Sequence, residues 1–177
     1  MEVNGYKIRP GAKLIGADLR NANLSDADLA DAKLSGVNLE GANLKGARLT
    51  DASLEGANLK GANLTDAYMH GANLTDANLE GANLFRASLT NTNLWRANFT
   101  AANLNYANLS HAEAGLANLS GVNLARANLS GASLYETILH NADLSYANLR
   151  GASLYQAQKN SNTNLFLAWM PDGTINK

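Results

Sequence analysis

The sequence lacks cysteine, an excess of charge of either sign, and long hydrophobic runs. Without cysteine it has no disulfide, no catalytic thiol and no cysteine-ligated metal site. Its 15 acidic and 14 basic residues argue against a nucleic-acid binder driven by net positive charge, and equally against a strongly acidic mimic of nucleic acid. No run of 18 apolar residues is present, so no membrane span is expected. Residues 1–11 contain no apolar segment typical of a secretory signal, so the expected compartment is the cytoplasm.

The usual strand formers are also scarce, since Val, Ile and Thr together number only 16. In their place stand 31 Ala, 29 Leu and 25 Asn, which make up nearly half of the 177 residues. This composition departs from the usual globular mixture, and it directs attention to repeats.

A five-residue repeat accounts for the composition. Leu stands at position 14 and at every fifth position to 154, and only Met69, Phe99 and Ala114 replace it among the 29 centres. Two residues before the centre, 25 of the 29 positions are Ala; two residues after it, 19 are Gly, Asp or Asn. The motif Ala-(Asn/Asp)-Leu-x-(Gly/Asp) runs from Ala12 to Ala157 without an insertion or deletion.

The period of five excludes an amphipathic helix, although Ala and Leu favour helices. A helix turns about 100° per residue, so successive Leu residues would lie about 140° apart and form no apolar stripe. In a short extended segment, Ala and Leu two residues apart point the same way and Asn points outward. Gly, Asp and Asn then turn the chain. Each pentad is therefore one side plus one corner of a solenoid.

Stacked neighbours decide how many sides each coil has. At a spacing of 20 residues one column alternates in sign and another alternates cation with aromatic. These columns are Arg20, Glu40, Lys60, Glu80 and Arg86, Tyr106, Arg126, Tyr146. A spacing of 15 would instead stack like charges, such as Lys45 on Lys60. The square register is favoured, although Lys13/Lys33 and Asp31/Asp51 are like-charge pairs at spacing 20. About seven coils at roughly 4.8 Å spacing give a rod on the order of 35 Å long.

The repeated A(D/N)LxX pattern resembles that of the pentapeptide-repeat family. The resemblance implies an all-β fold, a right-handed parallel quadrilateral β-helix whose narrow interior has no room for a ligand. Residues 1–11 are then an N-terminal cap, 12–157 the β-helix and 158–177 a C-terminal cap segment.

Departures from the repeat give further expectations. Ala114 leaves a core position short of volume, which is either a tolerated defect or a site where Leu116 folds inward through a bulge. Thr92 and Thr137, at Ala positions, need a backbone acceptor if they are buried. The apolar end segment is either a cap or a homodimer contact. Its contact residues would be Leu165, Phe166, Trp169 and Met170.

No set of residues predicts catalysis, a cofactor or a metal. His70, His111 and His140 fall in different columns, and the glycines occupy corners rather than a phosphate loop. A column of asparagines at every twentieth position from 23 to 123 predicts a structural hydrogen-bonded ladder.

A protein-binding surface is the remaining functional expectation. Residues 14–80 hold ten acids and five bases, whereas residues 81–157 hold three acids and four bases and most of the aromatics. Either these aromatics only stabilise the coils or they form a protein-binding wall. The candidate residues are Phe85, Arg86, Trp95, Arg96, Tyr106, Arg126, Tyr135, Tyr146 and Tyr155.

We therefore expect a non-enzymatic structural scaffold or protein–protein interaction module with an unknown protein partner. The family resemblance implies an alternative, a DNA-mimicking binder of DNA gyrase that protects it from quinolones. The same resemblance implies a cyanobacterial source.

Overall fold

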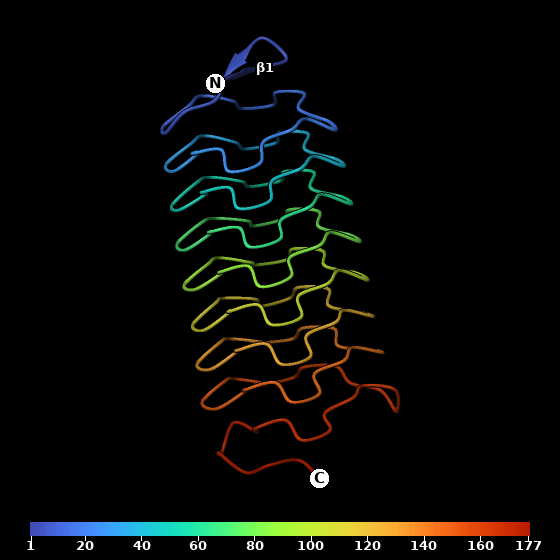
Figure 1. Ribbon diagram of the computed structural model, residues 1–177. Coiled ribbons are helices and arrows are strands. Elements are labelled where there is room, and N and C mark those ends of the chain that lie inside the picture. Colours follow the sequence, from blue (N-terminus) through green and yellow to red (C-terminus); the bar gives the residue numbers. More distant parts are fainter.

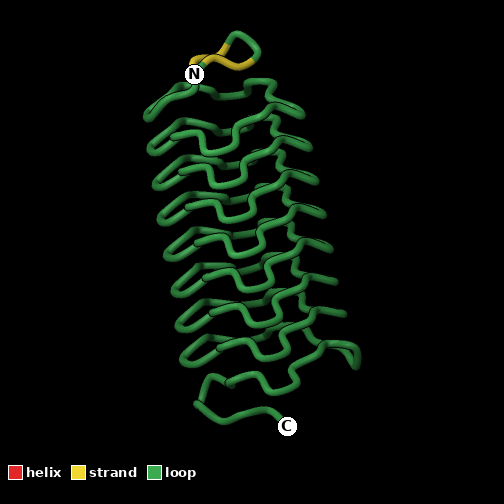
Figure 2. The backbone as a smooth tube through the Cα atoms, in the orientation of Figure 1, coloured by secondary structure: helices red, strands yellow, loops and turns green.

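The chain winds into a straight stack of four-sided coils, as the computed structural model of residues 1–177 shows (Figure 1). It has no helix, and therefore none long and apolar enough to cross a membrane. Two short strands, β1 (Glu2–Val3) and β2 (Tyr6–Lys7), form an antiparallel hairpin at the N-terminal end (Figure 2). Between coils, single-residue bridges run parallel at a spacing of 20 from Lys13 to Gln158, which confirms the quadrilateral register.

Each coil presents four faces, which we number in chain order. Their first outward bridging residues are Lys13, Asp18, Asn23 and Asp28, for the first to the fourth face. A corner takes the names of the two faces that it joins. The seven complete coils comprise residues 12–31, 32–51, 52–71, 72–91, 92–111, 112–131 and 132–151.

Every corner of the repeat has the same backbone, that of a type II turn. At one corner the Ala42 N–H donates to the Leu39 carbonyl at 3.0 Å, and Gly41 between them has a φ of 65°. The equivalent second corner residue has a positive φ throughout residues 16–156. Glycine, asparagine and aspartate dominate this position because they adopt that conformation most readily.

The inward side chains, nearly all of them Ala and Leu, form one continuous core of 57 buried residues. The two buried threonines satisfy their hydroxyls as expected: Thr92 donates to the Leu89 carbonyl, and Thr137 donates to the Leu134 carbonyl at 2.9 Å. No buried side-chain polar atom lacks a hydrogen-bond partner.

The irregularity at Ala114 is a core defect and not a bulge. Ala114 is buried, and its N–H keeps the regular hydrogen bond to the Ser133 carbonyl at 2.8 Å. Leu116 occupies a corner position in register, with a φ of 58° and its side chain outward. Of the two alternatives, the inward fold of Leu116 is therefore not adopted, because the turn backbone at this position directs the side chain away from the core.

Outward side chains follow the predicted columns only in part. On the third face Asn43 donates to Asn23 at 3.1 Å and Asn63 to Asn43 at 3.3 Å, but Asn83 donates to Thr65 instead of Asn63. The amide ladder is therefore interrupted.

In the charged column, Arg20 and Lys60 each form an ion pair with only one of the oppositely charged residues near them. Lys60 pairs with Glu80 at 3.0 Å, as the alternation of sign predicts. Arg20, by contrast, pairs at 2.6 Å with Asp18, two residues away, and makes no ion pair with Glu40.

Parallel pairing continues past the predicted end of the repeat at residue 157. Asn164 and Trp169 bridge to Asp143 and Asn148 at a spacing of 21, because one extra residue is inserted before Asn164. The chain then turns back, and Ile175 pairs antiparallel with Trp169 as a short cap. The segment 158–177 is thus part coil and part cap.

Candidate protein-binding ridges

The Arg–Tyr ridge is the third–fourth corner of coils three to seven, where Asp66, Arg86, Tyr106, Arg126 and Tyr146 stack one per coil. The Arg126 guanidinium lies between two phenol rings, 5.4 Å from the centroid of Tyr106 and 5.5 Å from that of Tyr146. It also donates a hydrogen bond to the Tyr106 hydroxyl. Arg86 Nε donates to Asp66 Oδ1 at 2.7 Å. The predicted cation–π column therefore forms from Tyr106 to Tyr146, whereas Arg86 lies over the Phe85 ring, 5.7 Å from its centroid, instead of the Tyr106 ring.

Two phenylalanines extend the ridge sideways. Phe85 packs edge-on against Tyr106 at 5.9 Å between ring centroids, and Phe166 packs edge-on against Tyr146 at 5.8 Å. Despite these contacts Tyr106, Tyr146 and Phe166 remain 46%, 47% and 51% exposed. The ridge is therefore an aromatic surface that faces solvent.

The backbone of the ridge adopts a conformation that its residues do not favour. Arg86, Tyr106, Arg126 and Tyr146 have φ angles of 59°, 60°, 61° and 59°. A residue with a Cβ, other than Asn or Asp, costs about 1–2 kcal/mol in this left-handed region. Such strain is concentrated at functional sites more often than elsewhere.

The Trp–Tyr ridge lies on the first–second corner. Trp95 and Tyr135 stack with centroids 6.4 Å apart and planes 8° apart, and Tyr135 stacks on Tyr155 at 6.0 Å. Gly115, in the coil between the first two rings, makes this possible, because a Cβ there would lie 2.2 Å from the Trp95 ring. Tyr155 ends the stack and is 65% exposed.

Leu116 and Arg96 complete this second ridge. Leu116 is 38% exposed although its corner position would suit a polar residue. Two hydrogen bonds from the Arg96 guanidinium to Asp76, at 2.7 and 2.5 Å, hold the pKa of the Asp76 carboxyl below its usual value. A hydrogen bond to the Glu136 carboxylate raises the pKa of the Tyr135 hydroxyl. The ridge thus combines an apolar strip with a fixed guanidinium.

The structure divides the predicted wall between two diagonally opposite corners. Trp95, Arg96, Tyr135 and Tyr155 lie on the first–second corner, and the other five candidates lie on the third–fourth corner. A flat partner surface therefore contacts one ridge at a time.

The predicted end contact is less apolar than the sequence suggests. Leu165 and Met170 pack partly against the core, and the Arg150 guanidinium covers the Trp169 ring at 3.6 Å from its centroid. Phe166, the fourth residue, belongs to the Arg–Tyr ridge. The inserted residue before Asn164 places Phe166 at the first residue of its corner instead of the second.

One exposed aromatic was not among the predicted residues. Tyr68 replaces the usual Asn on the fourth face and is 56% exposed. The five-residue period already placed it outward, so the signal was present in the sequence.

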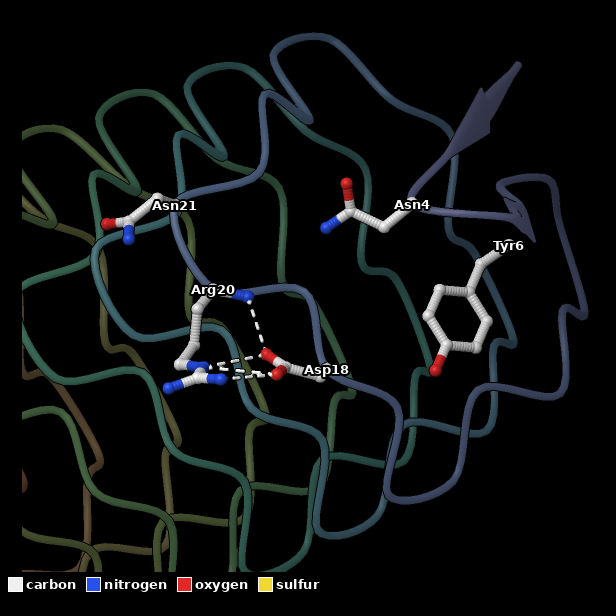
Figure 3. Close-up of a pocket in the computed structure, with 5 residues that line it drawn as sticks. All are labelled: Asn4, Tyr6, Asp18, Arg20 and Asn21. Atoms are coloured by element: carbon white, nitrogen blue, oxygen red, sulfur yellow. Dashed lines mark hydrogen bonds and ion pairs between the residues drawn. The ribbon is translucent and has the colours of Figure 1, made fainter.

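The hollows of the surface are open depressions. An open depression of 520 Å³ lies beside the N-terminal hairpin and is lined by Asn4, Tyr6, Asp18, Arg20 and Asn21 (Figure 3). Asp18 and Arg20 hydrogen-bond to each other there, and the Arg20 guanidinium lowers the pKa of the Asp18 carboxyl. No three His, Asp or Glu side chains come close enough to hold a metal ion.

Comparison with known proteins agrees with the repeat and the fold. A family model described as pentapeptide repeats matches eight copies, over residues 11–46, 42–81, 82–114 and 117–156. One similar solved structure is HetL, a pentapeptide repeat protein involved in heterocyst differentiation regulation from the cyanobacterium Nostoc sp. strain PCC 7120. It is 38% identical, the match covers 94% of this chain and 86% of that chain, and the TM-score is 0.41.

Two further solved structures are similar. AT2G44920, a pentapeptide repeat protein from the thylakoid lumen of Arabidopsis thaliana, is 35% identical over 58% of this chain and 69% of that chain, with a TM-score of 0.54. QnrB1, a plasmid-mediated fluoroquinolone resistance protein, is 23% identical over 86% of each chain, with a TM-score of 0.45, and this likeness supports no functional conclusion. No curated protein matches the chain.

Proposed function

Because the chain belongs to the pentapeptide-repeat family and winds as a right-handed quadrilateral β-helix, we propose that it is a non-enzymatic scaffold that binds a partner protein. Its interior is filled by Ala and Leu, so any function is carried by the outer surface. The Trp–Tyr ridge is the surface that we assign to the partner.

The single observation that carries this proposal is the outward position of Leu116, next to Gly115 in the coil between those of Trp95 and Tyr135. A corner needs only Gly, Asn or Asp, yet this one holds an exposed leucine in a left-handed backbone. Trp95, Arg96 and Tyr135 lie on the same corner in the two neighbouring coils, and Trp, Tyr and Arg are the residue types enriched in binding hot spots. The arrangement is costly for folding and favourable for binding.

The gyrase-binding alternative receives less support. DNA mimicry requires a continuous acidic surface, whereas four arginines and only three acids occupy residues 81–157. A gyrase supercoiling assay titrated with this protein separates the two functions, and we expect no change in supercoiling.

Affinity capture with surface variants tests the scaffold function. We expect Leu116→Asn with Tyr155→Ser to reduce recovery of the partner at least about tenfold, since each hot-spot truncation typically costs more than 1 kcal/mol. The lysate would come from a cyanobacterium, the source that the relative HetL favours. Ile15→Ser is the matched control, because Ile15 is an exposed apolar residue on the same corner of the first coil.

A second pair of substitutions, Trp95→Ser with Tyr135→Ser, removes the stack itself. Far-UV circular dichroism must show that each variant keeps its fold. If both double variants capture the same partners as the unmodified protein, the Trp–Tyr ridge is not the binding surface.

A further inference from the structure

The side of the rod centred on the fourth face reverses its charge along the axis. We define this fourth side as the outward residues of the fourth face and of its two bounding corners. In coils one to three it carries five carboxylates and two cations: Asp26, Asp28, Asp31, Asp51 and Asp66 with Lys45 and Arg48. In coils four to seven it carries three guanidiniums and no carboxylate: Arg86, Arg126 and Arg150.

The other three sides do not reverse. On the side centred on the third face, cations and carboxylates balance in both parts of the rod. The sides centred on the first and second faces are weakly acidic in both parts. When the charges are counted by side over coils one to three and four to seven, the reversal of sign is therefore confined to the fourth side.

Part of this charge has no partner within the chain. Arg48 pairs loosely with Asp28 at 3.8 Å, and Arg86 pairs with Asp66 at 2.7 Å. Three carboxylates remain without an ion pair near the N-terminal end, and two guanidiniums remain without one near the other end. These are Asp26, Asp31 and Asp51, and Arg126 and Arg150.

We propose that the fourth side binds a second copy of this chain, with the two rods side by side and antiparallel. A surface that is acidic at one end and basic at the other is complementary to itself when one copy is reversed. This is the condition for an isologous two-fold interface. The inference does not rest on the proposed function, because the Trp–Tyr ridge lies outside the fourth side.

The positions of the residues set the register of the two copies. The two-fold axis lies in the interface and is perpendicular to both rods. It therefore places each corner opposite the same corner of the other copy. With the axis between coils three and four, Asp26 in coil one lies opposite Arg126 in coil six. The in-chain pair Asp66–Arg86 flanks the axis and meets its own copy, so that four alternating charges gather at the centre.

An apolar contact at the centre accompanies the charges. Tyr68, in coil three of the fourth face, stands between Arg48 and Ser88 in its column and is 56% exposed. In the same register it faces Ser88 of the other copy, whose small side chain leaves room for the ring. Central aromatic residues surrounded by polar groups are typical of protein interfaces.

The physics predicts weak and salt-sensitive association. Exposed ion pairs contribute only about 0.2–1 kcal/mol each, and salt screens them. Complementary charge acts mainly on the rate and orientation of encounter, while like charges in opposition are costly. We therefore expect a dimer at low salt that dissociates as salt increases.

Charge exchange at one contact tests the proposal. Sedimentation velocity at about 0.02 M and about 0.5 M salt measures dimerisation with and without screening. Arg126→Asp or Asp26→Arg alone should weaken dimerisation about tenfold or more, because the two-fold axis places each change in two contacts. The double variant Asp26→Arg with Arg126→Asp should return to within about threefold of the original affinity, since opposite charges face each other again.

Exchanging the charges of residues 26 and 126 should disturb the fold little. Asp and Arg both occupy this corner position with positive φ, at residues 26 and 126. Ala101→Asp, at the equivalent position of the second–third corner and outside the fourth side, is the matched control and should leave the dimer unchanged. Because the chain has no cysteine, Ser88→Cys supplies a single thiol near the axis, and a short bis-maleimide should join two copies at low salt.

Three results would overturn the proposal. The first is a monomer at low salt, and the second is a dimer that Arg126→Asp does not weaken, which would place the contact elsewhere, for example at the C-terminal end. The third is a double variant no better than the single ones, or Ser88→Cys chains that are not joined in a sample that is dimeric.

Discussion

The two halves of the rod build the same turn from different residues. From position 16 to 81, all 14 second corner residues are Gly, Asn or Asp. From position 86 to 156, only five of 15 are Gly or Asn, and the others include Arg, Tyr, His and Leu. The φ angles of both groups are positive, so the fold imposes the conformation whether or not the residue favours it.

The core of the second half also departs further from the regular repeat than the core of the first half. The first half has an almost unbroken Leu column, with Met69 as its one substitute, whereas Thr92, Phe99, Ala114 and Thr137 all lie in the second half. The exposed aromatic ridges lie there too. We infer that the uniform half is the more stable one, because the second half displays large side chains from a left-handed backbone that they do not favour.

The largest expected effect comes from placing the second half's core defect in the first half. Leu54 lies on the same face as Ala114 and is fully buried. Leu54→Ala should lower the free energy of unfolding by about 2–5 kcal/mol, because it removes buried methyl groups and leaves a cavity. Urea denaturation measures the change; a loss below about 1 kcal/mol would mean that the first half is not the more tightly packed one.

A glycine comparison should show the next largest effect. Gly115→Ala should destabilise the protein by about 1–3 kcal/mol, because the new methyl group displaces the Trp95 ring from its stack. Gly56→Ala meets no atom within 4 Å and bears only the cost of its φ of 63°, about 1–2 kcal/mol.

Fluorescence distinguishes these two glycine variants. In a Trp169→Phe background, only Gly115→Ala should change the emission of Trp95. An unchanged spectrum would show that the stack over Gly115 does not form in solution.

A stabilising substitution tests whether the second half carries strain. Leu116→Asn should raise the free energy of unfolding by roughly 0.5–1 kcal/mol, because Asn tolerates the left-handed backbone and Leu does not. Thermal unfolding measures this gain. A loss of stability would contradict the view that Leu116 is retained for binding rather than for folding.

The smallest effect concerns two ion pairs and pH. The folded-state pKa of the carboxyl is lowered in both Asp18 and Asp76 by hydrogen bonds from Arg20 and Arg96. A depressed carboxyl pKa contributes stability that is present above the unfolded value and is lost as pH falls through the folded value.

The two pairs differ in sequence distance. Asp18 and Arg20 are neighbours even in the unfolded chain, whereas Asp76 and Arg96 meet only when coils stack. Arg96→Gln should therefore weaken the pH dependence of stability in acid more than Arg20→Gln. Urea midpoints measured at several acidic pH values check this, and equal slopes would contradict it.

Most of the fold was predictable because the period fixes it. The spacing of Leu and Ala assigned the core, and the spacing of opposite charges assigned four sides to each coil. Lys13 and Lys33 stack directly although they repel, because the core register outweighs a single exposed pair. The candidate site was predictable only as a set of outward residues.

The sequence by itself determined the column and the coil in which each side chain stands, because an unbroken period of five leaves the backbone no alternative. Only the tertiary structure decided which neighbours meet. Arg20 had Asp18 and Glu40 within reach and pairs with the first, Leu116 points outward, and Trp95 reaches past Gly115 to Tyr135. These outcomes depend on the rotamers and the space around each side chain, and a repeat pattern does not specify either.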